Sequence, residues 1–276
     1  MVKSHAEWGN LKDDDLLPIL DGWLTRLNSE KPREDFLHTY LAKHAKIAFW
    51  DKIGFATVIS KLRLGADFIT DFVVVYDNWS NGIHYKLIEI EKPQMPPYTK
   101  EGIPSSGLSR ALQQVLSWQA WLKGHPSEAK KLFPSRFHDT EITPTFSYQI
   151  IIGNRENSKL WLDRRRMLSE STGISIVSFD HITPRVSNTM GFRDYSGVGD
   201  EKYSMCLSDR NNLACPFVKA LSDPAWRAIV RNGRHGSDHF MHAYGDLLRD
   251  HQVENEYANR YRRILSERKK AKSGGV

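Results

Sequence analysis

The stretch that decides the fold reads DFVVVYDNWSNGIHYKLIEIEKP over residues 71–93. One strand is expected over 71–76 and a second over 85–91, with a polar turn between them. Continuous runs rich in Val and Ile, bounded by turn residues, are typical of buried strands. A helical segment over 106–122, which carries Gln114, would return across both strands. The stretch therefore predicts a small sheet with a helix packed on it.

The second strand places two glutamates on one face. Successive strand residues point to opposite faces, so Glu89 and Glu91 share a face with Leu87, while Ile88 and Ile90 point to the other. The two glutamate side chains would lie about 7 Å apart along the strand. A pair of solvated glutamates on an edge strand is the alternative, and the apolar neighbours favour a core strand instead.

Three carboxylates can meet at this end of the sheet, because Asp71 begins the neighbouring strand. Like charges this close raise each other's pKa unless a cation lies between or beside them. Mg²⁺ prefers oxygen ligands from one or two carboxylates, completed by water and phosphate. The sequence therefore predicts a Mg²⁺ site, which Mn²⁺ could also fill, formed by Asp71, Glu89 and Glu91.

The ordered set of motifs around these residues resembles the PD-(D/E)xK nuclease superfamily and, more narrowly, the Shedu anti-phage defence nucleases. The motifs are Asp71-Phe, Glu89-Ile-Glu91-Lys92-Pro93, Tyr98-Thr-Lys-Glu-Gly102 and Ala111-Leu-Gln-Gln-Val-Leu-Ser-Trp118. The resemblance covers roughly residues 33–182. It implies that Asp71 and Glu89 are the two acidic residues of the superfamily, that Gln114 is the glutamine of the following helix, and that Glu34 is the acidic residue of the preceding helix.

The chain departs from the superfamily pattern where a lysine is expected two residues after the glutamate. Glu91 stands at that position and Lys92 comes one residue later. Glu91 could take the lysine's place as a metal ligand or a base. Alternatively, a bulge at Pro93 could turn Lys92 back into the site. We favour Glu91 and keep Lys92 as a candidate.

The coarse order of elements is helix, three strands, helix and strand, followed by one more helix and strand. This α-β-β-β-α-β order is that of an α/β, restriction-endonuclease-like core with a mixed central sheet flanked by helices. Glu34 opens the first helix, where it could equally be an acid stabilised by the helix dipole. The expected ranges are helix 33–44, strand 55–59, a run 62–64, a segment 67–70 continuing into the strand at Asp71, strand 148–152, helix 156–171 and strand 174–179.

The chain divides into three predicted parts. Residues 1–32 form an N-terminal helical segment, residues 33–182 form the nuclease-like domain, and residues 183–276 form a linker with a helical, basic C-terminal extension. Helices are expected near 223–232 and 238–267 in the extension. Its basic end could contact DNA or assemble copies of the chain, or it could be a solvated terminal helix.

Composition is that of an ordinary soluble globular protein, with 276 residues, 40% hydrophobic and 26% charged. No apolar run approaches the ~20 residues that a membrane helix needs, and the first residues lack an apolar h-region, so we expect no secretory signal. Two cysteines, Cys206 and Cys215, do not form a disulfide framework. We therefore expect a cytoplasmic protein without membrane attachment, whose net charge of +6 suits a polyanionic partner.

Other motifs give weaker indications. The proline-rich loop after Pro93 could touch a substrate strand through Lys100, or simply cross the fold. The basic run 164–166 is expected to be solvated surface. His235, His239 and His242 lack further ligands at zinc spacing, and no nucleotide-binding glycine motif is present.

Two functions follow from these observations. The first is a Mg²⁺-dependent endonuclease that hydrolyses DNA phosphodiester bonds, and the resemblance implies anti-phage defence and a homo-oligomer. The second is a catalytically inactive nuclease fold that binds DNA or assembles. A glycosidase is disfavoured because two carboxylates on one strand face cannot flank a glycosidic bond.

Overall fold

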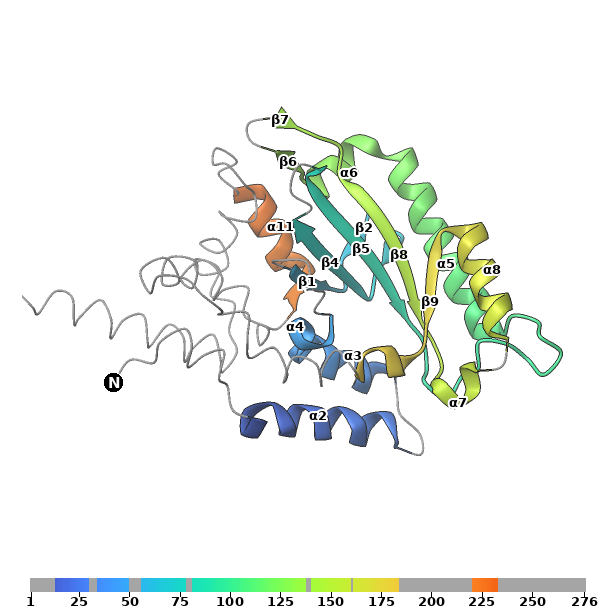
Figure 1. The fold of residues 1–276 in the computed structure, drawn as a ribbon. Coiled ribbons are helices and arrows are strands. Elements are labelled where there is room, and N and C mark those ends of the chain that lie inside the picture. Colours follow the sequence, from blue (N-terminus) through green and yellow to red (C-terminus); the bar gives the residue numbers. More distant parts are fainter. Residues whose placement is uncertain are drawn as a thin grey trace, which may run out of the picture.

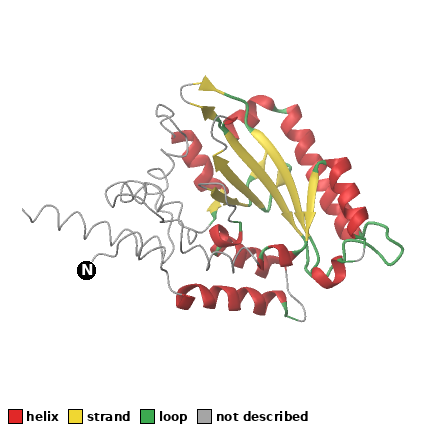
Figure 2. Ribbon diagram, viewed as in Figure 1, coloured by secondary structure: helices red, strands yellow, loops and turns green. Residues whose placement is uncertain are grey.

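The computed structural model describes most of the chain between residues 13 and 232. A central sheet has helices packed on both of its faces (Figures 1 and 2). This arrangement confirms the mixed α/β sheet flanked by helices. The residues described are 13–29, 34–49, 56–77, 81–137, 140–159, 161–183 and 220–232.

The sheet has six strands in the order β10-β1-β4-β5-β8-β9. β4 is antiparallel to both of its neighbours, β1 and β5, whereas β8 is parallel to β5, β9 is parallel to β8, and β10 is parallel to β1. The strands are β1 Ala56–Ser60, β4 Phe72–Asp77, β5 Ile83–Ile90, β8 Thr145–Ile151, β9 Ile174–Val177 and β10 Leu221–Ser222.

Strand parity separates two cores. Val73 and Leu87 point to one face, where they pack with Trp118 and other residues of the later helices. Phe72 and Ile88 point to the other face, toward the N-terminal helices. The first face carries α5 Ser106–Gly124, α6 Pro126–Leu132, α8 Leu162–Thr172 and α11 Asp223–Asn232, and the second carries α2 Asp13–Leu27, α3 Glu34–Lys43 and α4 Ala45–Ala48.

The expected continuous run from residue 67 into the strand at Asp71 was wrong. Instead β2 Arg63–Leu64 and β3 Phe68–Ile69 pair as a separate small hairpin, with Gly65 at a positive φ of 62°. Thr70 N donates to Leu62 O at 2.9 Å and closes this hairpin before β4 begins. The hairpin therefore stands beside the sheet, rather than lengthening it.

The expected helix over 156–171 is two helices, α7 Arg155–Ser158 and α8, because Trp161 adopts a left-handed conformation with φ 67°. Asn154 and Asn157 form a capping box that fixes the start of α7. The strand expected over 174–179 ends at Val177, and the 3₁₀ helix η2 Phe179–His181 follows. The short hairpin of β6 Arg136–Phe137 and β7 Thr140–Glu141 was not predicted.

Part of the C-terminal extension returns to the sheet. The helix predicted near 223–232 is confirmed as α11, and the preceding β10 pairs with β1, which the sequence did not indicate. Trp226 is fully buried and donates from its indole N–H to Leu132 O at 2.9 Å. Residues 220–232 thus belong to the packed body of the protein.

Helix α2 packs in the same way at the other end of the chain. Trp23 is 1% exposed and donates to Thr183 Oγ1 at 3.0 Å, which ties α2 to the end of the predicted nuclease-like domain. No helix in the described ranges is both long enough and apolar enough to span a bilayer. The cysteines, the histidines at 235–242 and the helix expected over 238–267 lie outside the described residues.

Candidate active site

Asp71 and Glu89 lie side by side at one end of the sheet. Phe72 of β4 pairs with Ile88 of β5 in an antiparallel register. Asp71, which precedes Phe72, therefore lies opposite Glu89, which follows Ile88. Asp71 Oδ2 accepts a hydrogen bond from Ile90 N at 2.8 Å, which fixes its carboxyl against β5. Asp71 and Glu89 are buried, with exposed fractions of 5% and 7%.

The Glu89 carboxyl holds a proton. Burial, followed by the negative charges of Asp71 and Glu91, raises the pKa of Glu89 to about 10. Its protonated carboxyl hydrogen-bonds to the Asp71 side chain. Gln114 of α5 donates from Nε2 to Glu89 Oε2 at 3.1 Å. The pair therefore carries one negative charge.

Lys61 supplies a cation that the sequence did not single out. Its ammonium group pairs with Asp71 Oδ1, and its backbone N–H donates to Asp71 O at 3.0 Å. Lys61 has a φ of 55°, a conformation that costs a non-glycine residue energy. Because Ser60 pairs with Phe72 in the sheet, the next residue along β1 falls beside Asp71. That antiparallel register is the signal that could have found Lys61.

Glu91 is paired with a second unforeseen cation, Arg110 in the first turns of α5. Arg110 Nη2 donates to both Glu91 carboxylate oxygens at 2.9 Å, and Nε adds a contact of 3.3 Å. Burial raises the pKa of Glu91, and the guanidinium opposes that shift. Arg110 and Gln114 are four residues apart, so the helix presents both to the end of β5. This i, i+4 spacing was the available sequence signal.

Glu34 and Lys92 occupy different surroundings. Glu34 lies in the first turn of α3, where burial raises its pKa and the charges of Asp71 and Glu91 raise it further. The structure thus brings Glu34 into the electrostatic reach of the carboxyl group pair. The side chain of Lys92 is exposed. The backbone carbonyl of Lys92 accepts hydrogen bonds from Gly153 N at 3.2 Å and from Met95 N at 3.1 Å.

His38 supports Asp71 from the opposite face of the sheet. Its Nε2 lies 3.3 Å from Asp71 O and 3.4 Å from Ser60 Oγ, and its ring stacks on Phe72 with centroids 4.5 Å apart. Burial and the charge of Lys61 lower the pKa of His38. A neutral imidazole at this position holds the backbone between β1 and β4 without adding charge.

The oxygen ligands available at the site come from the Asp71–Glu89 carboxyl pair, and the charged groups of Lys61 and Arg110 already lie beside the site. In the ranges that the structure describes, no group of three His, Cys, Asp or Glu residues is arranged to hold a metal ion. Glu89 hydrogen-bonds to Asp71, while Glu91 is paired with Arg110. These two carboxyl groups are the residues able to take a divalent cation between them.

The loop after Pro93 is anchored to α8. Tyr98 and Pro104 form an isolated bridge, and Arg164 Nη1 donates to Gly102 O at 2.7 Å. Arg164 also lies over the Trp161 ring at 4.8 Å. One arginine of the run 164–166 therefore holds this loop, while Lys100 is exposed at its tip.

Residues 31–182 match a protein-family model described as Shedu protein SduA, C-terminal. The chain belongs to the Shedu family. The match spans more than half of the chain and includes Glu34, Lys61, Asp71, Glu89 and the other site residues. Membership in the Shedu family confirms the motif resemblance to Shedu proteins and associates the chain with anti-phage defence. β10 and α11 lie outside the matched Shedu region.

The remaining comparisons add nothing to the Shedu assignment. Neither a curated protein nor a solved structure matches the chain significantly.

Proposed function

We propose that the chain is a metal-dependent endonuclease that hydrolyses DNA phosphodiester bonds in defence against phage, built on a PD-(D/E)xK-type core. The observation that carries this proposal is the buried Asp71–Glu89 pair, with Lys61 and Gln114 against it. Two acidic residues, a lysine and a helix glutamine are the residue types that the superfamily uses. Here they converge from β1, β4, β5 and α5 at one end of the sheet.

The carboxyl pair fits a divalent cation. Two carboxyl groups in contact, one of them protonated because of its burial and the other's charge, favour a cation that lets both ionise. Asp71 and Glu89 would hold Mg²⁺, for which one or two carboxylates suffice, and Mn²⁺ could substitute. When bound, the cation would acidify a water molecule and stabilise charge on the scissile phosphate.

Lys61 takes the position of the missing lysine in this proposal. The superfamily lysine would follow Glu89 on the same strand, whereas here the ammonium group reaches Asp71 from the end of β1. Its side chain is 52% exposed, so it can also contact a phosphate oxygen or a water beside the carboxyl group pair. Gln114 orients Glu89, and the Ile90 N–H orients Asp71.

Arg110 and Glu91 form the phosphate side of the site. Arg110 is 66% exposed although its partner Glu91 is 3% exposed, so the guanidinium faces solvent while the carboxylate fixes its position. A guanidinium held in this way binds phosphate oxygens through its planar fork of donors. In this proposal Glu91 positions the Arg110 guanidinium and does not bind the metal.

A DNA-binding protein without cleavage activity is the second candidate. It is favoured by one observation: Lys61 and Arg110 already neutralise Asp71 and Glu91, in the way a metal would. Such a protein would bind the same phosphates and leave them intact. Its homo-oligomeric assembly, like that of the nuclease, is a prediction that light scattering of the purified chain would test.

Cleavage of supercoiled plasmid separates the two candidates. With Mg²⁺ or Mn²⁺ the chain should nick or linearise plasmid DNA, and EDTA should stop the reaction. Asp71→Asn should lower the rate at least about 100-fold, since several kcal/mol of charge stabilisation are removed. Asp163→Asn, which changes a carboxylate 89% exposed on α8, is the matched control and should leave the rate unchanged. Absence of cleavage with either metal would favour the binding protein.

A further inference from the structure

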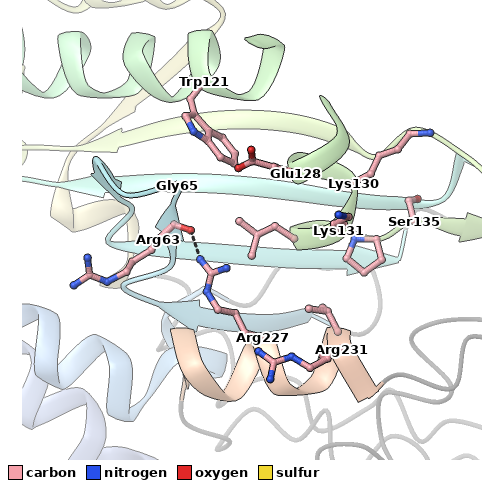
Figure 3. A pocket seen from close by; sticks show the side chains of 12 residues that line it. Arg63, Gly65, Trp121, Glu128, Lys130, Lys131, Ser135, Arg227 and Arg231 are labelled. Carbon is pink, nitrogen blue, oxygen red and sulfur yellow. Dashed lines mark hydrogen bonds between the residues drawn. The ribbon is translucent and has the colours of Figure 1, made fainter. Parts of the chain in front are cut away.

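A basic cavity of about 720 Å³ lies between the β2–β3 hairpin, the end of α5, α6 and α11 (Figure 3). It is separate from the carboxyl pair, and α11 lies outside the region matched to the Shedu family. One acidic residue, Glu128, is among the described residues that line it. Five cationic side chains from three elements line it: Arg63, Lys130, Lys131, Arg227 and Arg231.

Two of the arginines fix the walls of the cavity. Arg227 Nε contacts both Asp223 carboxylate oxygens, at 2.9 and 3.0 Å, and Arg227 Nη2 donates to Arg63 O at 2.6 Å, drawn as the dashed line in Figure 3. Asp223 Oδ1 also accepts from Arg63 N at 2.9 Å. This latch of Arg63, Asp223 and Arg227 holds α11 against β2.

The other three cations are uncommitted. Lys130, Lys131 and Arg231 are exposed, and they have no ion-pair partner among the described residues. Exposed cations gathered around a concavity attract a polyanion and release its counterions on binding. Lys130, Lys131 and Arg231 can therefore be replaced without breaking the hydrogen bonds among Arg63, Asp223 and Arg227.

The hairpin connects the cavity with the candidate active site. At one end Ile69 O accepts a hydrogen bond from Gln114 at 3.4 Å, and at the other Gly65 packs so closely on Trp121 that an added Cβ would lie 2.8 Å from Nε1. Gln114 and Trp121 are seven residues apart on α5, about 10 Å along its axis. Ser135, on the far side of the cavity, accepts a hydrogen bond from Ile83 N, six residues before Glu89 on β5 and about 20 Å away along the strand. The cavity therefore spans a region roughly three to six phosphates from the carboxyl pair along one strand of duplex DNA.

We propose that this cavity binds the sugar–phosphate backbone of a DNA strand, about three to six phosphates from the bond held at Asp71 and Glu89. The inference rests on the proposed function and names a second contact region for the same substrate. Backbone recognition is favoured over base recognition because Trp121 is 8% exposed and His125 stacks on its ring at 5.1 Å. No open aromatic face remains for a base among the described residues that line the cavity, so the interaction orients the strand independently of sequence.

The salt dependence of DNA binding by the full chain tests this proposal. A short labelled duplex is titrated in EDTA at several KCl concentrations, so that no cleavage interferes. The variant Lys130→Ala/Lys131→Ala/Arg231→Ala should lower the slope of log affinity against log salt by about 2 to 3, close to one for each phosphate that the protein no longer neutralises. Its thermal unfolding should match that of the parent, because the latch is untouched.

A control variant removes the same charge elsewhere. Lys159→Ala/Arg165→Ala/Arg166→Ala changes exposed or half-buried residues around α8, beside β9 at the opposite edge of the sheet from β10 (Figure 1). Its salt slope should stay within about one unit of the parent's. An unchanged slope in the cavity variant, or an equal decrease in the control, would overturn the proposal.

Plasmid cleavage by the parent, measured in parallel, keeps the two proposals apart. A lower slope in the cavity variant together with an inactive parent supports the DNA-binding cavity and rejects the nuclease. Cleavage by the parent together with an unchanged salt slope in the cavity variant supports the nuclease and rejects the DNA-binding cavity. If a nucleoside triphosphate displaces the duplex and the cavity variant loses affinity for the triphosphate alone, the cavity is a nucleotide site and the proposal is wrong.

Discussion

Lys61 is joined to Asp71 twice, by a backbone hydrogen bond of 3.0 Å and by an ion pair between the ammonium and carboxylate groups. The lysine adopts a positive φ of 55° to make both interactions. A residue held in a costly conformation beside a buried carboxyl pair indicates a role that outweighs the strain.

Replacing Lys61 by two different residues separates its charge from its backbone. Both Lys61→Met and Lys61→Gly should lower plasmid cleavage by about 10-fold or more, because the ammonium is removed in each. Lys61→Gly should unfold at higher denaturant than Lys61→Met, since glycine accepts the left-handed conformation that costs other residues about 1 kcal/mol. Full activity in either variant would exclude Lys61 from the chemistry.

The stability of the metal-free protein should fall as pH rises. The folded-state pKa of Glu89 is about 10, above its ordinary value of 4.5, so between these values the folded chain holds a proton that the unfolded chain releases. The unfolded state binds fewer protons in this window, which makes the free energy of unfolding decrease with pH. Urea unfolding in EDTA at about pH 6 and about pH 9 measures the decrease.

Glu89→Gln is the control for this pH dependence, because the amide cannot release the proton yet keeps a hydrogen-bond donor toward Asp71. Its stability should change less between the two pH values. Mg²⁺ should restore stability at the higher pH in the parent more than in the variant, since binding favours the ionised pair. Parallel pH profiles for the two proteins would contradict the assignment of the proton to Glu89.

Glu91, Lys92 and Arg110 form a second series. If Glu91 positions Arg110, both Glu91→Gln and Arg110→Met should weaken DNA binding and cleavage, while Lys92→Met should cost much less. Arg110→Met should also destabilise the fold by about 1–3 kcal/mol, because the buried carboxylate loses its partner. A dead Lys92→Met with an active Glu91→Gln would show instead that Lys92 fills the lysine role.

Glu34 is expected to be a peripheral member of the site. The charges of Asp71 and Glu91 raise the pKa of Glu34, yet Glu34 is only half buried at the start of α3. Glu34→Gln should therefore reduce cleavage less than Asp71→Asn does, with both rates measured on plasmid at matched folding. An equal or greater loss for Glu34 would reverse this ranking and make it a principal ligand.

Strand parity and helix spacing explain which parts of the site were predictable. The alternation along β5 placed Glu89 on the face of α5, and the position of Gln114 on that helix brought the two within 3.1 Å. Both inferences use only the local period of one element. Lys61 was missed because its pairing with Asp71 depends on strand register, which one strand's sequence does not contain. Arg110 was missed although its i, i+4 spacing from Gln114 was available.

The fold shows the same division. The β4–β5 pair follows from apolar runs, and α5 follows from buried residues spaced three or four positions apart, both of which local sequence encodes. The β2–β3 hairpin and the break at Trp161 depend on single residues in left-handed conformations, and one of them is not glycine. β10 is two residues long and carries no periodic pattern, so only its partner β1 defines it.

That short strand also affects how the chain is made. β10 covers backbone groups of β1 at Ile59 and Ser60, and an uncovered strand edge invites pairing with another chain. The strand that covers it is translated well after β9, while synthesis proceeds at about 5–20 residues per second. Because β10 follows β9 in the chain, the β1 groups at Ile59 and Ser60 lack this partner until β10 is synthesised.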